Sequence, residues 1–263
     1  FSIILLMLRP RIIPCLLIRN NGLVKTINFS EEKYIGDPIN AVKIFNEKLV
    51  DELMIIDIDA TVKMKEPNFN LIKKIAAESQ MPISYTGGIK NVEQIKRIIS
   101  YGVEKVGISS GAIINPELIS NASKEVGSQS VVVVLDVKKK ILGGYNVYTH
   151  NGKNDTGYKV ESLAKDLTNR GAGELIINSI DNDGKMKGYD INIIKDIKKT
   201  VSVPVTLIGG AGSIDDIKKL VEEFHIIGAA AGSLFVFQGK YKAVLINYPD
   251  QDEKNYIFNS LIK

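Results

Sequence analysis

Two glycine pairs occupy matching places in this 263-residue chain, and a serine-containing pair follows each of them. Gly87-Gly88 and Gly209-Gly210 come directly after short apolar runs, and Ser109-Ser110 and Gly232-Ser233 come after the next run along the chain. Glycine lets backbone N–H groups approach an anion, and a helix start adds a favourable dipole. A single pair is also typical of a tight turn. The duplicated pattern predicts two phosphate cradles, suited to a ligand with two phosphates or two anionic ends.

Carboxylates follow several of the same apolar runs. Asp136 ends the run Val131–Leu135, so we expect it at a strand end, where it could act as a general acid or base. Asp181 and Asp183 lie in the turn-like segment Asp-Asn-Asp-Gly; we predict a ligand contact for Asp181, with loop capping as the alternative for both residues. The histidines His150 and His225 lie far apart and neither neighbours a cysteine, so we expect no metal site and no cofactor.

Eight short apolar runs rich in β-branched residues alternate with amphipathic segments such as Asn91–Tyr101. Continuous apolar runs are typical of parallel strands covered on both faces. Eight strand-helix units in about 250 residues indicate a (β/α)8 barrel, with an open doubly wound sheet as the alternative. The predicted strands are Ile12–Ile18, Leu53–Ile58, Pro82–Tyr85, Lys105–Ser109, Val131–Val137, Glu174–Asn178, Val203–Ile208 and His225–Ala230.

An internal repeat favours the closed barrel. Residues 52–59 align with residues 174–181, and at the same offset Gly87-Gly88 falls on Gly209-Gly210. Two equivalent four-strand halves can close on each other without an exposed edge. We therefore predict a TIM barrel of two duplicated half-barrels. We expect one long loop, after Val131–Val137, in which Gly143-Gly144 turns a hairpin over the barrel mouth.

Composition limits the other possibilities. Lys and Arg number 34 against 30 Asp and Glu, which gives a net charge of +4. The lysines are scattered along the chain, and this excludes a nucleic-acid binder of the usual basic type. No apolar stretch is long enough to cross a membrane. The single cysteine, Cys15, cannot form an internal disulfide and fits a cytoplasmic protein. We expect residues 1–10 to be an N-terminal extension, with Met7 as a plausible start, and residues 11–263 to form one barrel domain.

From about Arg11 to Phe237 the sequence resembles the cyclase subunit of imidazole glycerol phosphate synthase. The motifs that carry the resemblance include Arg11-Ile12-Ile13-Pro14-Cys15-Leu16, Asp51-Glu52-Leu53, Gly87-Gly88-Ile89, Tyr148-Thr149-His150-Asn151-Gly152, Ser179-Ile180-Asp181, Gly188-Tyr189-Asp190 and Gly209-Gly210-Ala211-Gly212. The resemblance implies a barrel that receives ammonia from a glutaminase docked at its bottom. It also implies cyclisation of a doubly phosphorylated ribonucleotide at the top, in histidine biosynthesis.

The resemblance also assigns roles to individual residues. Its ammonia gate corresponds to four charged residues at strand N-terminal ends, Arg11, Glu52, Lys105 and Glu174. Its loop lysine corresponds to Lys25, its phosphate sites to the Gly and Ser pairs, and one of its two catalytic aspartates to Asp136. The second aspartate is replaced by Leu17, which the internal repeat makes equivalent to Asp136. A leucine transfers no proton, so ordinary cyclase activity is in question.

Three hypotheses follow. The first is an ammonia-dependent cyclase-lyase with Asp136 as its acid or base. The second is a non-cyclising barrel that passes ammonia to a sugar amidotransferase, because Leu17 and the segments 20–26 and 242–249 resemble a branch of the family associated with bacterial surface sugars. The third is a relative of the histidine-pathway isomerase, which the charged ring argues against because an isomerase needs no ammonia gate.

Overall fold

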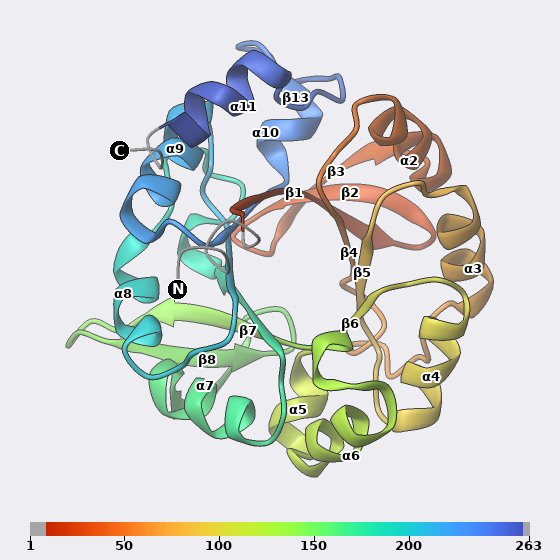
Figure 1. The fold of residues 1–263 in the computed structure, drawn as a ribbon, viewed down its shortest axis with the longest axis vertical. Coiled ribbons are helices and arrows are strands. Elements are labelled where there is room, and N and C mark those ends of the chain that lie inside the picture. The colour runs from red at the N-terminus through yellow and green to blue at the C-terminus, as the bar shows by residue number, and fades with distance from the viewer. Residues whose placement is uncertain (1–8, 260–263) are drawn as a thin grey trace.

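Eight parallel strands close into a barrel in the computed structural model, which describes residues 9–259 (Figure 1). β12 pairs with β1 and β10 pairs with β7, so the sheet has no open edge among the barrel strands. The predicted (β/α)8 barrel is confirmed. The barrel strands are β1 (Arg11–Arg19), β4 (Leu53–Asp57), β5 (Ile83–Thr86), β6 (Lys105–Ile108), β7 (Val131–Lys139), β10 (Glu174–Ser179), β11 (Val205–Ile208) and β12 (Gly228–Ala231).

Helices form an outer ring around the strands (Figure 1). In the helix predicted around Asn91–Tyr101, the Asn91 side chain accepts from the N–H of Gln94, and Ile95 and Ile98 are buried against the barrel. The helices are α2 (Pro38–Glu47), α3 (Phe69–Glu78), α4 (Val92–Ser100), α5 (Ser110–Ile114), α6 (Glu117–Val126), α7 (Val160–Asn169), α8 (Ile191–Lys198), α9 (Ile214–Phe224), α10 (Ser233–Val236) and α11 (Gln251–Phe258), with short 3-10 turns η1 (Ser128–Ser130) and η2 (Ile180–Asn182).

The predicted strand starts near residues 203 and 225 are too early. Strand β11 begins at Val205, directly after Pro204, which has no backbone N–H to donate to the ladder. Strand β12 begins at Gly228 because His225, at φ +60°, ends helix α9. In both cases the predicted strand included residues of the loop that leads into it.

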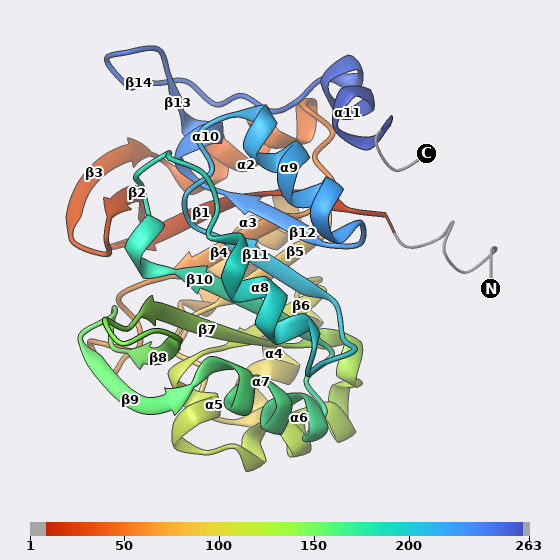
Figure 2. The ribbon, with the colours of Figure 1, turned by 90° about the vertical axis from the view of Figure 1, so that its left-hand side faces the viewer.

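Two hairpins extend over the same end of the barrel, whereas the sequence predicted one. The predicted hairpin joins β7 to β8 (Tyr145–Thr149), which pairs in turn with β9 (Asn154–Lys159). The second extends β1 through β2 (Gly22–Ile27) and β3 (Glu31–Gly36). Figure 2 shows both at the left-hand end of the barrel. The expectation of a single long loop was wrong because β3 is polar and exposed and carries no apolar run.

The duplication is visible in the strand register. In the first half Leu17, Ile56 and Thr86 are Cα partners across β1, β4 and β5. In the second half Asp136, Asn178 and Ile208 are Cα partners across β7, β10 and β11. The two rows occupy equivalent positions, which supports the predicted equivalence of Leu17 and Asp136.

The buried side chains separate into two clusters. The larger cluster lies between the strands and the helices, and α2 contributes Phe45 to it. The smaller cluster, which we call the interior cluster, fills the barrel centre. Its buried members are Ile13, Cys15, Met54, Ile56, Val132, Val134, Ile176, Ile208 and Ala230. The barrel interior is therefore a packed core, as in this fold generally.

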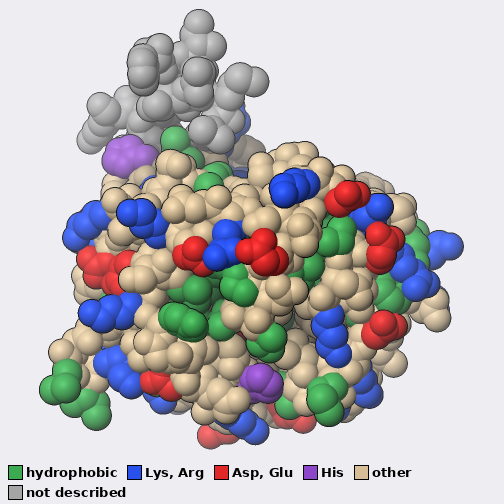
Figure 3. All heavy atoms as spheres, turned by 90° about the horizontal axis from the view of Figure 1, so that it is seen from below, with side chains coloured by type: hydrophobic (Ala, Val, Ile, Leu, Met, Phe, Trp, Pro, Cys, Tyr) green, Lys and Arg blue, Asp and Glu red, His purple; other side chains and the backbone are tan. Residues whose placement is uncertain are grey.

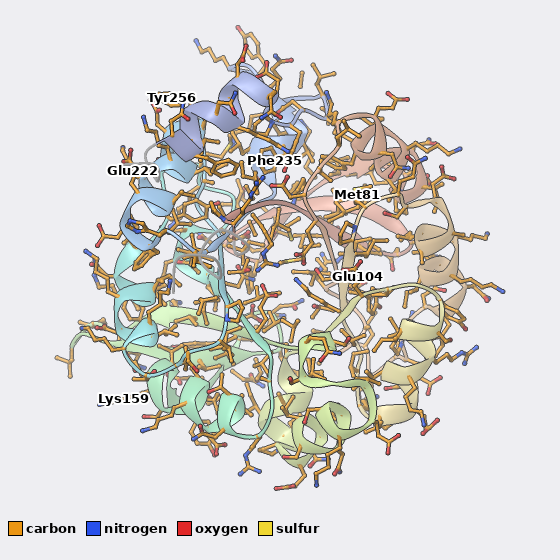
Figure 4. The ribbon with its side chains drawn as sticks, in the orientation of Figure 1. Met81, Glu104, Lys159, Glu222, Phe235 and Tyr256 are labelled. Carbon is orange, nitrogen blue, oxygen red and sulfur yellow. The ribbon has the colours of Figure 1, made fainter. Side chains whose placement is uncertain are left out.

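A C-terminal segment completes the outer ring. After α10 the chain forms the short strands β13 (Phe237–Gln238) and β14 (Ala243–Val244). Tyr248, which follows them, packs against Phe235 of α10 with ring centroids 5.5 Å apart. Helix α11 lies against α9, where the Tyr256 hydroxyl donates to Asp215 at 3.1 Å and Lys218 lies over the Tyr256 ring (Figure 4). The segment therefore closes the helical ring beside β1.

The face formed by α5, α6 and α7 carries Lys and Arg side chains beside Asp and Glu, without a continuous patch of one sign (Figure 3). Within residues 9–259 no helix is long and apolar enough to cross a membrane. The interpretations placed on residues 1–8, including the start at Met7, lie outside the described residues.

Candidate active site at the barrel mouth

A closed ring of four charged side chains encircles the barrel axis at the N-terminal ends of the strands. Arg11 donates from Nη1 to Glu52 at 2.5 Å and from Nη2 to Glu174 at 2.6 Å. Lys105 completes the ring, with its ammonium 2.8 Å from Glu52 and 2.9 Å from Glu174. The structure thus brings together all four residues of the predicted gate, and their order around the ring alternates in charge.

Neighbouring charges in the ring shift the pKa values of Glu174 and Arg11. Burial alone would raise the pKa of Glu174, but the charges of Arg11 and Lys105 outweigh it and lower that pKa. The Thr206 hydroxyl also donates to Glu174 at 2.7 Å. Burial would lower the pKa of Arg11, whereas Glu174 and Glu52 raise it overall. The shifts of both pKa values favour the charged forms of Arg11 and Glu174.

A pocket opens at the opposite, C-terminal end of the strands, with about 1170 Å³ of space including its open mouth. This is the end of the barrel where sites lie in this fold. Residues from all eight barrel strands or the loops that follow them line it. Those predicted from the sequence are Lys25, Gly87, Gly88, Ser109, Ser110, Asp136, Gly209, Gly210, Gly232 and Ser233.

Asp181 is the predicted site residue that the pocket lining does not include. Its carboxylate accepts from the backbone N–H of Lys139 at 2.9 Å, so it fastens η2 to the β7–β8 hairpin. Two residues further on, Asp183 does line the pocket. This bond fits the alternative of a loop-fixing role, and the ligand contact of Asp181 stays a prediction.

Asp136 lies at the pocket floor, where its carboxylate accepts from Asn178 Nδ2 at 2.9 Å. Burial raises the pKa of Asp136 to about 7, against the lowering effect of the Asn178 hydrogen bond. A carboxyl group with this pKa exchanges protons readily at neutral pH. The geometry gives Asp136 the properties of a general acid or base.

Lys25 reaches back into the pocket from β2. Its ammonium donates to the Cys15 carbonyl at 2.6 Å, and a Cβ at position 232 would lie 2.0 Å from Lys25 Nζ. Gly232 therefore leaves the space that the ammonium occupies. Burial lowers the pKa of Lys25. An anion entering the pocket would find this cation beside the second Gly-Ser pair.

Asp183 fixes the β2–β3 hairpin at the rim of the pocket. Its carboxylate accepts from the Thr26 hydroxyl at 2.8 Å and from the backbone N–H of Phe29 at 3.1 Å. The next residue, Gly184, has φ +67°, and a Cβ there would lie 2.1 Å from the Thr26 carbonyl. The hairpin that carries Lys25 is therefore packed tightly on the loop after β10.

The glycine pairs also have a packing role that needs no ligand. Gly88 and Gly210 have φ of +71° and +112°. A Cβ on Gly210 would lie 2.1 Å from the Gly188 carbonyl, and one on Gly88 would lie 3.0 Å from the Lys65 carbonyl. Both glycines thus allow neighbouring mouth loops to approach closely. Tight turns and anion cradles are compatible at these positions.

Other lining residues had no distinct signal in the sequence. Thr86 directly follows a predicted strand, Asn178 ends another, and His150 and Asn151 follow β8. His150 was expected to have no role in a metal site, and it lines the mouth beside Asn151, which donates to the Ile58 carbonyl at 3.1 Å. Within residues 9–259 no three His, Cys, Asp or Glu side chains group closely enough to hold a metal ion.

Comparisons with known proteins agree with this geometry. The histidine biosynthesis protein family matches residues 11–242. A protein of Leptospira borgpetersenii is 56% identical over 253 residues, which cover 96% of this chain and 100% of that relative. A Vibrio vulnificus protein is 54% identical, covering 94% and 96%, and a Lactococcus lactis protein is 38% identical, covering 98% of both chains. All three are named imidazole glycerol phosphate synthase subunit HisF, the first two provisionally.

The chain belongs to the HisF family. The resemblance stated from the sequence motifs is thereby confirmed. This HisF-type barrel differs from its expected pattern at the pocket floor, where Leu17 occupies the place equivalent to Asp136 and also lines the pocket. The floor of this family member therefore offers one carboxyl group at the ends of β1 and β7 instead of two.

Proposed function

We propose that this HisF-type subunit uses ammonia, delivered by a glutaminase docked at the barrel bottom, in a cyclase-lyase reaction of the imidazole glycerol phosphate synthase type. The ligand would be a ribonucleotide with two phosphates, held by the glycine and serine pairs. Lys25 would neutralise anionic charge on the ligand, and Asp136 would transfer a proton. No cofactor is required by these roles.

The observation that carries the proposal is the placement of the charged ring directly beneath the pocket on one barrel axis. The ring closes the bottom, and the interior cluster of apolar side chains separates it from the pocket floor. An apolar interior of this kind favours transit of neutral NH3 over ammonium, because burial of an unpaired charge is costly. The arrangement suits separate entry of ammonia from below and of a phosphorylated ligand from above.

Asp136 can perform a proton transfer here, but Leu17 cannot supply a second one. With a pKa near 7, Asp136 can accept a proton from an attacking nitrogen or donate one to a leaving group. Loss of one proton-transfer group typically costs about 10²- to 10⁴-fold in rate. We therefore expect slow cyclisation unless water or a ligand group replaces the missing carboxylate.

The test is turnover of the formimino ribonucleotide substrate with ammonium salts, which bypass the glutaminase. We expect product from the wild-type chain and at least a 100-fold loss in Asp136→Asn. The Lys96→Ala variant, on the outer surface, serves as the control. Absence of product from the folded wild-type chain would reject the cyclase assignment.

A second candidate function is ammonia delivery, without cyclisation, to an enzyme that amidinates a bacterial surface sugar. The specific observation in its favour is Leu17 at the pocket floor, in register with the apolar Ile56. This candidate predicts that Leu17→Asp gains cyclase activity with ammonium salts while wild type has none. Cyclase activity in the wild type, or none in Leu17→Asp, would count against it.

A further inference from the structure

We propose that the pocket floor recognises the central part of its ligand by one edge, with hydrogen-bonding groups on Thr86, Asp136 and Asn178 and an apolar wall of Leu17, Ile56 and Ile208. The inference deepens the proposed function, on which it rests for the anionic ends of the ligand. It assigns ligand contacts to Thr86 and Asn178, and it defines the chemistry of the ligand between those ends.

The strand order separates the six floor residues into two continuous arcs. Around the barrel, β11, β12, β1 and β4 are neighbours, and Ile208, Leu17 and Ile56 come from this side. The strands β5, β6, β7 and β10 are neighbours on the other side, and three of them contribute Thr86, Asp136 and Asn178. All six side chains line the pocket. One wall is therefore apolar and the facing wall is polar.

The half-barrel duplication shows how this asymmetry arises. The rows Leu17, Ile56, Thr86 and Asp136, Asn178, Ile208 occupy equivalent positions in the two halves. At each of the three equivalent pairs, one residue is apolar and the other is polar. The polar members are Thr86 of the first row and Asp136 and Asn178 of the second. Their strands β5, β7 and β10 lie on the same side of the barrel, so the polar groups gather there.

Thr86 supplies the observation that points to a ligand. Its hydroxyl is buried without a hydrogen-bond partner, although Thr86 is only 4% exposed and lines the pocket. On the neighbouring strand, Gly107 leaves the space in front of it, since a Cβ there would lie 2.0 Å from Thr86 Oγ1. Leaving a buried hydroxyl without a partner destabilises the folded chain. A polar atom of a ligand seated on the floor would satisfy it.

The apolar wall adds selectivity by exclusion. Leu17, Ile56 and Ile208 pack together with the interior cluster, and none of them can donate or accept a hydrogen bond. A ligand group with donors or acceptors on that side would lose its hydration without compensation. The ligand class that fits is an elongated molecule with anionic ends and a planar centre, such as a carboxamide heterocycle, whose polar groups lie along one edge.

The test compares two probes that share one anionic end. The aminoimidazole carboxamide ribotide carries a planar heterocycle with polar groups, whereas ribose 5-phosphate has no heterocycle. We expect the wild-type chain to bind the ribotide at least 30-fold more tightly by calorimetry. In Thr86→Val the ribotide should bind about 10-fold more weakly while ribose 5-phosphate changes less than 2-fold.

Matched variants isolate the hydroxyl. Thr86→Ser should restore ribotide affinity to within 3-fold of wild type. Ile208→Thr, which places a hydroxyl at the equivalent position on the apolar wall, should give no gain, either alone or combined with Thr86→Val. Because the Thr86 hydroxyl has no partner, Thr86→Val should fold with an unchanged or higher melting temperature.

Any result that differs from these expectations overturns a specific part of the proposal. Equal affinity for the two probes, or unchanged ribotide affinity in Thr86→Val, would reject edge recognition and leave the anionic sites intact. Restored affinity in the combined variant would reject the division into two walls. Binding of neither probe would reject both this inference and the proposed ribonucleotide ligand.

Discussion

Asp136 is destabilising to the folded chain when it is ionised. Its ordinary pKa is 3.8, and burial raises it to about 7 in the fold, so the folded chain holds this proton where the unfolded chain has lost it. Stability falls with rising pH wherever the folded state binds more protons. The contribution from Asp136 is therefore fully favourable below about pH 4 and is lost as the pH rises toward 7.

Asp136→Asn removes this pH dependence and keeps the hydrogen bond from Asn178, because an amide oxygen can accept it. We expect the variant to gain about 2 kcal/mol relative to wild type between pH 5 and pH 8.5. Urea unfolding at the two pH values measures the difference. An identical stability difference at both would show that Asp136 titrates normally in the fold.

At the residue scale, sequence reasoning located side chains that end an apolar run or lie in a motif. Asp136 and the glycine and serine pairs were found this way, and Lys25 through the family resemblance. Thr86 and Asn178 were missed because a polar residue inside a strand points inward or outward according to register, which the sequence does not determine. Asp181 and Asp183 could not be ranked from the sequence, because the roles of adjacent turn residues depend on the loop conformation.

The barrel strands position the charged ring as a unit, since Arg11, Lys105 and Glu174 each begin a strand and Glu52 directly precedes one. Removing Lys105 would leave two nearly buried carboxylates facing Arg11 alone. Breaking a buried ion pair costs up to 3–5 kcal/mol, and the partial exposure of Lys105 reduces this.

We therefore expect Lys105→Ala to destabilise the chain by about 2 kcal/mol in urea unfolding. Lys96→Ala serves as the control, because the ion pairs of Lys96 with Glu93 and Glu125 are exposed and should contribute little to stability. Equal effects of the two variants would contradict a cooperative ring.

The β2–β3 hairpin is the element whose position depends most closely on one residue. Gly184→Ala would place a Cβ 2.1 Å from the Thr26 carbonyl, at a backbone φ of +67°. We expect a loss of about 2–3 kcal/mol and faster protease cleavage between residues 22 and 36.

Gly143→Ala is the matched control for the hairpin, since its φ is +92° and a Cβ there meets open space. It should cost about 1 kcal/mol from backbone strain alone, with unchanged cleavage of residues 22–36. If both variants were cleaved equally fast, the contact between Gly184 and Thr26 would not be what fixes the hairpin.

At the scale of the whole molecule, the repeat predicted more than any single motif. Periodicity gave eight strands, and the aligned halves favoured closure over an open sheet, which the β10–β7 pairing bears out. The second hairpin was beyond this reasoning because its outer strand, β3, is stabilised by backbone pairing and not by burial. Sequence patterns report burial, so elements that remain in solvent leave little signal.

The ring, the interior cluster and the pocket lie in sequence along the barrel, so a bulky residue in the middle layer should separate the two ends. Ala230 of β12 is fully buried in the interior cluster, where a larger side chain has no free space. In a complex with the glutaminase, Ala230→Leu should therefore reduce glutamine-dependent product at least 10-fold while changing ammonium-dependent product less than 3-fold, with ammonia released to the solvent. Overpacking would also cost about 1–3 kcal/mol, which a melting curve measures separately. Equal losses with both nitrogen sources would place the damage at the pocket and contradict a passage through the barrel.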